Sequence, residues 1–156
     1  MSIANTKSEV AENYIAAISK SNFKKAAEYV NPKELSELHT MFKGIVSAND
    51  EVVLSVIGLE GLSQEELNSF SKIDVYAHFA EDMLSKQDKA NGHYENRQLI
   101  GIIEESESFA HAVIRDKSGD FNSMSITLIR KDKDWYVKVP TAMMGLLKLH
   151  LMYSQS

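Results

Sequence analysis

The sequence has no cysteine and no long hydrophobic run. The absence of cysteine excludes a disulfide framework, a thiolate nucleophile, and zinc or iron–sulfur sites with cysteine ligands. The longest apolar runs are Val52–Ile57 and Leu146–Met152, and both fall far short of the about 20 residues that a membrane-spanning helix needs. The polar segment Met1–Val10 lacks the apolar core of a secretory signal. We therefore expect no membrane association and a cytoplasmic location.

Glycine and proline are also sparse, with seven and two residues, and the glycines are scattered. Gly58 and Gly61 lack the lysine that a phosphate-binding loop needs, and the chain has no Gly-x-Ser-x-Gly nucleophile elbow. With 17 basic and 22 acidic residues, the net charge is −5. Nonspecific binding of nucleic acid needs a basic stripe that displaces counterions from phosphates, and this charge argues against it. We expect no cofactor and no nucleic-acid partner.

The composition is typical of one globular domain spanning residues 1–156, since 44% of the chain is hydrophobic, 25% is charged, and no repeat or linker is present. The first half has the periodicity of helices, with apolar residues three and four apart. Segment 49–57 fits a helix or a buried strand, and we favour a short helix ending at Gly58. Helix starts are indicated at Ser8, at Asn31-Pro32-Lys33-Glu34 and at the capping box Ser63-Gln64-Glu65-Glu66.

A predicted loop at Asp88–His93 precedes a region with the two-residue period of β-strands. The expected strands are Gln98–Glu104, Ser108–Arg115, Phe121–Lys131 and Trp135–Val139. Short turns join them, so they form an antiparallel meander, because parallel strands need long crossovers. Thr141–Tyr153 is predicted to be an apolar helix that is covered by the core or by a second subunit. The predicted fold class is α+β: N-terminal helices packed on a curved antiparallel sheet of about four strands, with a C-terminal helix.

In two parts of the sequence, the order of the expected helices and strands resembles that of a known superfamily. These parts are the helix Glu9–Ser19 with the break Ser21-Asn22-Phe23 and the second helix Lys24–Val30, and the terminal hairpin Ser123–Arg130, Lys131–Asp134, Trp135–Val139. This order is similar to the cone-shaped α+β fold of the nuclear transport factor 2-like superfamily, which includes ketosteroid isomerases, scytalone dehydratases and polyketide-cyclase-like proteins. The simplest members have fewer helices than we expect here between Pro32 and Gln87, and the helix expected after Pro140 is a further addition to their fold. The fold that the resemblance implies hosts unrelated functions.

The resemblance also implies dyads of aspartate with tyrosine or histidine inside the cone. His111 is one catalytic candidate. In its strand Ala110, Ala112 and Ile114 share the opposite face, and we expect these small and branched residues to pack against helices. His111 would then lie on the less buried side, where a hydrogen-bonded sheet histidine is the interpretation we favour.

His78 and Asp82 are further catalytic candidates, because they stand four apart on one helix face and could orient each other as a base and its partner. With Glu81 they could also offer metal ligands, but no His-Glu-x-x-His signature is present, and we favour a solvated face and no metal. The candidates for binding an apolar ligand are Tyr14, Tyr76, Phe79 and Trp135. Buried tyrosines more often satisfy their hydroxyl within the protein than polarise a substrate.

Three hypotheses for the function follow. The first is a non-catalytic domain that forms a homodimer and binds a small apolar ligand or a protein partner. The second is an isomerase- or dehydratase-like enzyme that applies general acid/base chemistry to a small hydrophobic substrate, which requires titratable groups converging in one cavity. The third is a regulatory or assembly subunit whose exposed helix docks on another protein.

Overall fold

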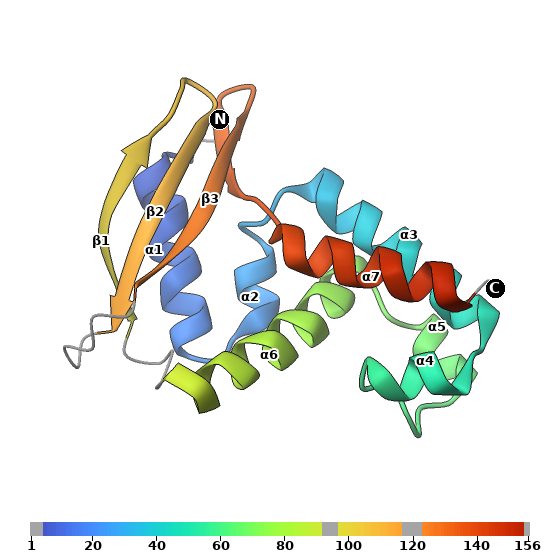
Figure 1. The fold of residues 1–156 in the computed structure, drawn as a ribbon. Helices are drawn as coiled ribbons and strands as arrows, with labels where there is room; N and C mark the ends of the chain where they lie inside the picture. Colours follow the sequence, from blue (N-terminus) through green and yellow to red (C-terminus); the bar gives the residue numbers. More distant parts are fainter. Residues whose placement is uncertain (1–4, 92–96, 117–122, 155–156) are drawn as a thin grey trace.

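The computed structural model describes residues 5–91, 97–116 and 123–154, and within them the side chains of 83–91, 116, 123, 124 and 142 lie outside the description. The fold is α+β: N-terminal helices precede a four-stranded antiparallel sheet, and a helix follows the sheet (Figure 1). The elements are α1 (Lys7–Ser19), α2 (Phe23–Ala27), α3 (Pro32–Ala48), α4 (Glu51–Val56), α5 (Gln64–Asn68), α6 (Lys72–Asn91), β1 (Arg97–Glu104), β2 (Phe109–Asp116), β3 (Ser123–Lys131), β4 (Asp134–Val137) and α7 (Thr141–Ser154). The predicted fold class is confirmed.

The sheet is a meander in the order β1-β2-β3-β4, as its short turns predict. Its two faces differ sharply in burial. On β2, Ala110, Ala112 and Ile114 are fully buried, whereas His111 and Val113 between them are half-exposed. Because successive side chains of a strand point to opposite faces, this alternation defines an inner and an outer face of the sheet. The prediction that the small residues of β2 face the helices is confirmed.

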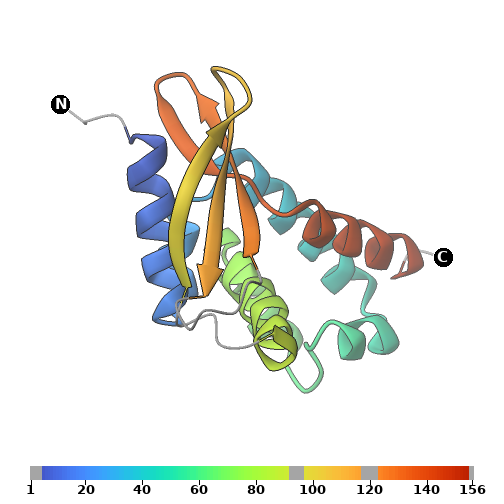
Figure 2. The same ribbon diagram turned by 60° about the vertical axis from the view of Figure 1, so that its left-hand side comes forward.

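Helix α1 covers the inner face of the sheet and packs against β1, β3 and β4 (Figure 2). Its buried residues are Val10, Ala11, Tyr14, Ile15, Ala17 and Ile18, which lie three and four apart. The helix begins two residues earlier than Ser8 indicates, because Thr6 is the N-cap and its hydroxyl accepts a bond of 3.2 Å from the Glu9 amide. The predicted apolar stripe is therefore correct, and the predicted cap is wrong.

Helices α3 and α7 lie side by side and form a second, all-helical part of the molecule together with α4 and α5 (Figures 1 and 2). Asn31 caps α3 and Pro32 occupies its first turn, as the sequence predicts. Segment 49–57 contains the short helix α4, whose N-cap Asp50 accepts from the amides of Val52 and Val53. Gly58 follows α4 with a φ of +79°, which suits glycine and ends the helix.

Helix α6 runs to Asn91, so the loop predicted for Asp88–His93 is wrong for its first four residues, and the rest lies outside the described residues. The reason is helix propensity: lysine and alanine, present at 89 and 90, are good helix formers, and the polarity of this segment alone does not break a helix.

The outer edge of β4 is bonded to the N-terminal third of the chain. The Trp135 amide donates to the Asn5 carbonyl (3.2 Å), and the Val137 amide donates to the Tyr29 carbonyl (2.7 Å). The Asn31 amide donates in turn to the Val137 carbonyl (2.9 Å). These bonds satisfy backbone groups that an edge strand otherwise leaves open, and they fix the start of α3 beside the sheet.

Candidate functional site

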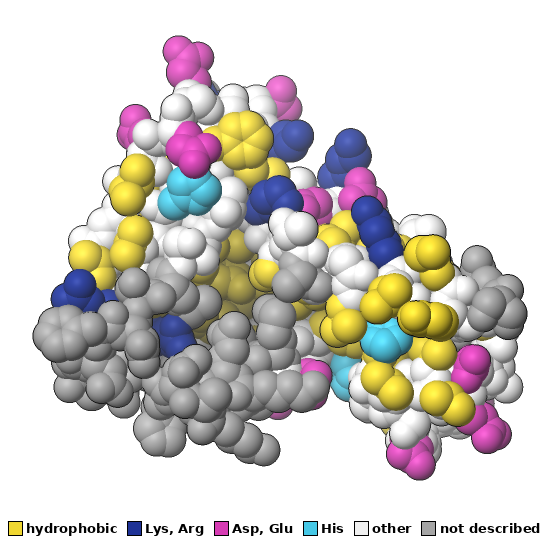
Figure 3. Space-filling model, in the orientation of Figure 1, with side chains coloured by type: hydrophobic (Ala, Val, Ile, Leu, Met, Phe, Trp, Pro, Cys, Tyr) yellow, Lys and Arg dark blue, Asp and Glu magenta, His cyan; other side chains and the backbone are white. Residues whose placement is uncertain are grey.

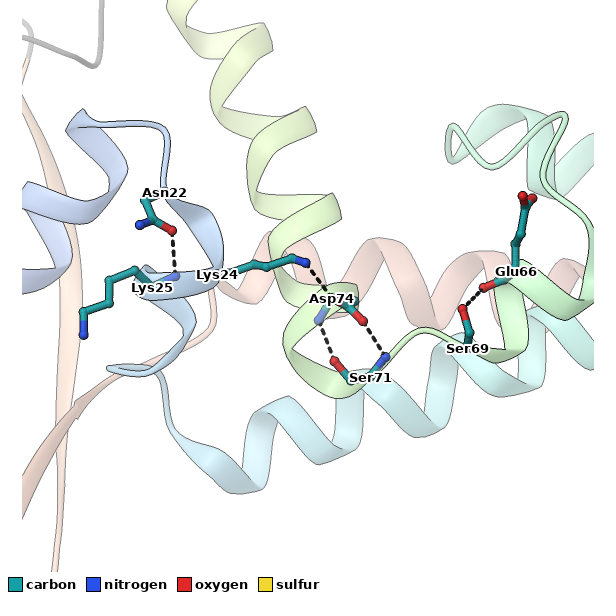
Figure 4. Close-up of polar contacts among 7 residues, drawn as sticks. All are labelled: Asn22, Lys24, Lys25, Glu66, Ser69, Ser71 and Asp74. Atoms are coloured by element: carbon teal, nitrogen blue, oxygen red, sulfur yellow. Dashed lines mark hydrogen bonds and ion pairs between the residues drawn. The ribbon is translucent and has the colours of Figure 1, made fainter.

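Helix α6 carries four of the candidate residues, Tyr76, His78, Phe79 and Asp82, and a capping box fixes its start. Ser71 and Asp74 exchange bonds as a capping box: the Ser71 amide donates to Asp74 Oδ2 (3.0 Å), and the Asp74 amide donates to Ser71 Oγ (3.1 Å) (Figure 4). Lys24 Nζ reaches from α2 to within 3.3 Å of Asp74 Oδ1. The bond from the Ser71 amide is the main cause that lowers the pKa of Asp74 below its ordinary value of 3.8. The carboxylate therefore stays charged, and its ion pair with Lys24 adds a polar contact to the packing of α2 on α6.

Tyr14 and Tyr76 meet in the core between α1 and α6. Their hydroxyl oxygens are 2.6 Å apart, and both side chains are buried. Burial raises the pKa of Tyr14 above its ordinary value of 10.0 and raises that of Tyr76 further. Both hydroxyls are thus neutral at physiological pH, and each serves as the partner of the other. The sequence names both residues as ligand candidates, and the structure brings them together as a bonded pair.

The other two ligand candidates lie apart from this pair and are also buried. Phe79 packs edge-on against Phe42, with ring centroids 6.4 Å apart. Trp135 lies on β4 against α1, and Lys7 Nζ stands 5.5 Å from the centroid of its ring. Both aromatic side chains therefore fill the core, and their role in ligand binding stays a prediction.

His78 is half-buried and has its contacts within the helical part of the protein. Its Nε2 is 3.3 Å from the Ile57 carbonyl oxygen, and its ring packs edge-on against Phe79 (5.1 Å) and Phe70 (6.2 Å). Asp82 lies exposed one turn further along α6. A ring with these neighbours links α6 to the end of α4, which is a structural role. An acid/base role for His78 and Asp82 stays a prediction.

His111 is the centre of a polar cluster on the outer face of the sheet. Its Nε2 is 2.8 Å from Glu105 Oε1, and its Nδ1 is 3.4 Å from Thr127 Oγ1. The sheet register places His111 directly opposite Thr127. A hydroxyl, an imidazole and a carboxylate in a row can pass a proton. The Glu105 carboxylate is largely exposed, however, and the cluster stands on an open sheet surface.

The sequence interpretation missed Glu105 and Thr127 as partners of His111. Glu105 lies in the acidic run Glu104-Glu105-Ser106-Glu107, whose composition is typical of a solvated turn. The register of the hairpin is the signal that finds the carboxylate, because Ile103 pairs with His111 and the chain then turns back beside it. Thr127 needs the register of the next strand pair as well, so its identification depends on where two turns begin and end.

Apart from the Tyr14–Tyr76 pair and the contact of His78 with Phe79, the candidate residues do not converge on one site. His111 lies on the outer face of the sheet, Trp135 is buried on β4 against α1, and His78 lies on α6 near the end of α4. Within the described residues, no three histidine, aspartate or glutamate side chains gather as a metal site requires. Across 5–91, 97–116 and 123–154, no helix is long and apolar enough to cross a membrane.

A different feature stands out on the surface of the helical part. Helices α4 and α7 pack against each other and expose large hydrophobic side chains, which gather on one side of the molecule (Figure 3). We define the α7–α4 surface by the exposed hydrophobic residues of these helices: Val52 (72% exposed), Val56 (62%), Leu146 (50%), Leu149 (47%), Met152 (70%) and Tyr153 (62%). The sequence of α7 contains no aspartate, glutamate or arginine, and Lys148 is its single lysine. Apolar groups gathered in this way mark an association site more often than a free surface.

Comparisons with protein-family models, curated proteins and solved structures gave no match for this chain.

Proposed function

We propose that this chain is a non-catalytic association domain that forms a homodimer through the α7–α4 surface. The observation that carries the proposal is the six large hydrophobic side chains exposed on two neighbouring helices. Leaving such side chains in water costs about 25 cal/mol for each Å² of apolar area, and a second copy of the same surface removes that area from water. We extend the proposal to membership of the nuclear transport factor 2-like superfamily, which rests on the order of elements.

The geometry of α7 supports a two-fold contact. Met143 and Leu147 face the core, whereas Leu146, Leu149 and Tyr153 follow each other at i, i+3 and i+7 along the exposed side. Residues at this spacing form one stripe on a helix, and such a stripe can pair with its own copy around a two-fold axis. The near absence of charge along α7 avoids the repulsion that like charges cause at a self-contact.

The test is sedimentation velocity at micromolar concentration on the wild type and on Leu149→Glu. We expect the wild type to sediment at twice the 17.5 kDa mass of the chain and the variant as a monomer with an unchanged circular dichroism spectrum. Ile103→Glu is the matched control, because Ile103 is exposed to a similar degree (60%) on the outer face of the sheet. A monomeric wild type, or a dimer broken by Ile103→Glu and kept by Leu149→Glu, contradicts the proposal.

An isomerase- or dehydratase-like enzyme is the alternative, and the Glu105–His111–Thr127 cluster is the observation that favours it. General acid/base catalysis needs a substrate held within hydrogen-bond reach of the base and shielded from water. The aromatic ligand candidates lie in the core on the other side of the sheet from this cluster. For this reason we prefer association over catalysis as the function.

A further inference from the structure

A surface pocket lies between the sheet and the start of α3. Its volume is about 380 Å³, within the range of about 300 to 1,000 Å³ that is usual for small-ligand sites. It occupies the notch between the two parts of the molecule, where basic and acidic side chains stand near hydrophobic ones (Figure 3). The lining residues are Asn31, Lys33, Glu34, Glu37, Ser108, Phe109, Ile129, Arg130, Lys131 and Lys138.

The apolar part of this pocket is made by two residues that pair across the sheet. Phe109 on β2 lies directly opposite Ile129 on β3, and both project from the outer face. Phe109 is 45% exposed, although it stands in a hollow beside a buried isoleucine. A ring exposed in this way offers a flat apolar contact to a bound molecule.

The charged part of the pocket is unusual for a chain whose net charge is −5. Four basic residues line the pocket against two acidic ones. One of the acids, Glu34, has its charge compensated: its Oε1 accepts from Asn31 Nδ2 and from the Val139 amide, each at 3.3 Å, and Lys138 Nζ lies 3.6 Å from its Oε2. The side chain of Glu34 is 12% exposed, and its contacts connect α3 to the segment that follows the sheet.

Outside the contact between Glu34 and Lys138, the lining carries three basic residues, Lys33, Arg130 and Lys131, and one acidic residue, Glu37. Lys33 lies in the first turn of α3, and Lys131 ends β3 on the same sheet face as Ile129. Arg130 uses its Nε to donate to the Asp132 carbonyl oxygen (3.1 Å). Two lysines that flank an apolar floor attract an anion whose body can pack on that floor.

We propose that this pocket binds a small amphipathic anion, with an aromatic or branched apolar body on Phe109 and Ile129 and one anionic group between Lys33 and Lys131. The pocket shares no residue with the α7–α4 surface. The proposed ligand site can therefore be tested independently of the proposed homodimer.

The probe is the arylsulfonate 8-anilinonaphthalene-1-sulfonate, and its uncharged counterpart is N-phenyl-1-naphthylamine. Fluorescence titration gives the affinity for each. In Lys33→Gln/Lys131→Gln we expect the arylsulfonate to bind about fivefold to tenfold more weakly, because two exposed charge contacts are lost, and the amine to bind as before. Phe109→Ser should weaken both probes. Raising the salt concentration should weaken only the arylsulfonate.

The matched control is Lys43→Gln/Lys72→Gln, which removes the same charge from exposed lysines outside the pocket. This variant should bind both probes like the wild type. An equal loss of affinity in the control, or no loss in Lys33→Gln/Lys131→Gln, overturns the proposal. So does arylsulfonate binding that Leu149→Glu abolishes and Phe109→Ser leaves intact, because the probe then occupies the α7–α4 surface.

Discussion

Helices α1 and α7 each bury one apolar face in the protein, but they differ in the side chains that they leave exposed. Helix α1 buries Val10, Tyr14 and Ile18 on the sheet, and its solvent side carries Glu9, Glu12 and Asn13 among others. Helix α7 buries Met143 and Leu147, yet its solvent side carries Leu146, Leu149, Met152 and Tyr153. Each helix is anchored by the apolar face that it buries, so we expect the exposed apolar side chains of α7 to contribute much less to folding than the buried ones. The comparison separates residues that fold the protein from residues available for association.

The largest expected effect tests this separation directly. Ile18→Ala removes a side chain that is 1% exposed and should lower the free energy of unfolding by about 2 to 4 kcal/mol, because a cavity remains in the core. Leu149→Ala should lower it by less than about 0.5 kcal/mol. Urea unfolding at a protein concentration at which the chain sediments as a monomer measures both. Similar losses in the two variants would mean that the solvent side of α7 is part of the fold.

A second prediction concerns the contact of α7 with α3. A Cβ added at Gly44 would stand 2.6 Å from Leu151 Cδ1, so α7 approaches α3 closely at this point. Gly44→Leu should lower the free energy of unfolding by about 1 to 3 kcal/mol through overpacking. Gly44→Ala is the matched variant, and its small side chain should cost much less, because the end of Leu151 can turn away. Equal effects of the two substitutions in thermal unfolding would contradict a close contact.

The Tyr14–Tyr76 pair should give a smaller effect that depends on pH. Tyr14→Phe leaves the Tyr76 hydroxyl without this partner and should cost about 1 to 2 kcal/mol near neutral pH. The double variant Tyr14→Phe/Tyr76→Phe should cost less than the sum of the single variants. Urea unfolding of all four proteins forms a double-mutant cycle, and additive losses would show that the two hydroxyls are not coupled.

The same pair sets a limit at high pH. Because burial raises the pKa of both tyrosines in the folded state, their contribution to stability is complete below the ordinary value of 10.0. It declines as the pH rises above that value, since the unfolded chain then releases protons that the folded chain retains. The double phenylalanine variant should lose less stability between neutral and alkaline pH than the wild type. An identical decline in both proteins would place the alkaline transition elsewhere.

The smallest effect is expected at the cap of α1. Thr6→Ala removes the hydroxyl that accepts from the Glu9 amide and should cost about 0.5 to 1 kcal/mol. Ser8→Ala is the control, because Ser8 lies exposed inside the helix and does not cap it. Thermal unfolding of the two variants distinguishes the predicted cap from the observed one, and a larger loss for Ser8→Ala would restore the prediction from the sequence.

The sequence predicts features that depend on near neighbours. The capping box at Ser63 and Glu66 forms both of its bonds, of 2.8 and 3.1 Å, and Asn31 and Pro32 begin α3 as expected. These features are local, because a cap involves groups only two or three residues apart. The predicted loop at the end of α6 is wrong because polarity alone does not end a helix. A polar segment remains helical when no residue in it breaks the helix.

The candidate site could not be predicted to the same extent, because its parts are distant in the sequence. The pairing of Tyr14 with Tyr76 depends on how α1 and α6 cross, and the pocket beside Phe109 depends on where α3 begins relative to the sheet. Residue types identify such groups as candidates, but only the packing of whole elements decides which of them meet. His111 shows this most clearly, since its face was predicted from alternation while its partners were not.

The bonds along the outer edge of β4 have a consequence for synthesis of the chain. Tyr29 and Asn31 emerge from the ribosome long before Val137, the residue to which their backbone groups are bonded. Part of the apolar surface of the N-terminal helices therefore stays uncovered until the last strand has been translated. Contacts so far apart in sequence slow folding, and this interval is when a chaperone would have the most surface to hold.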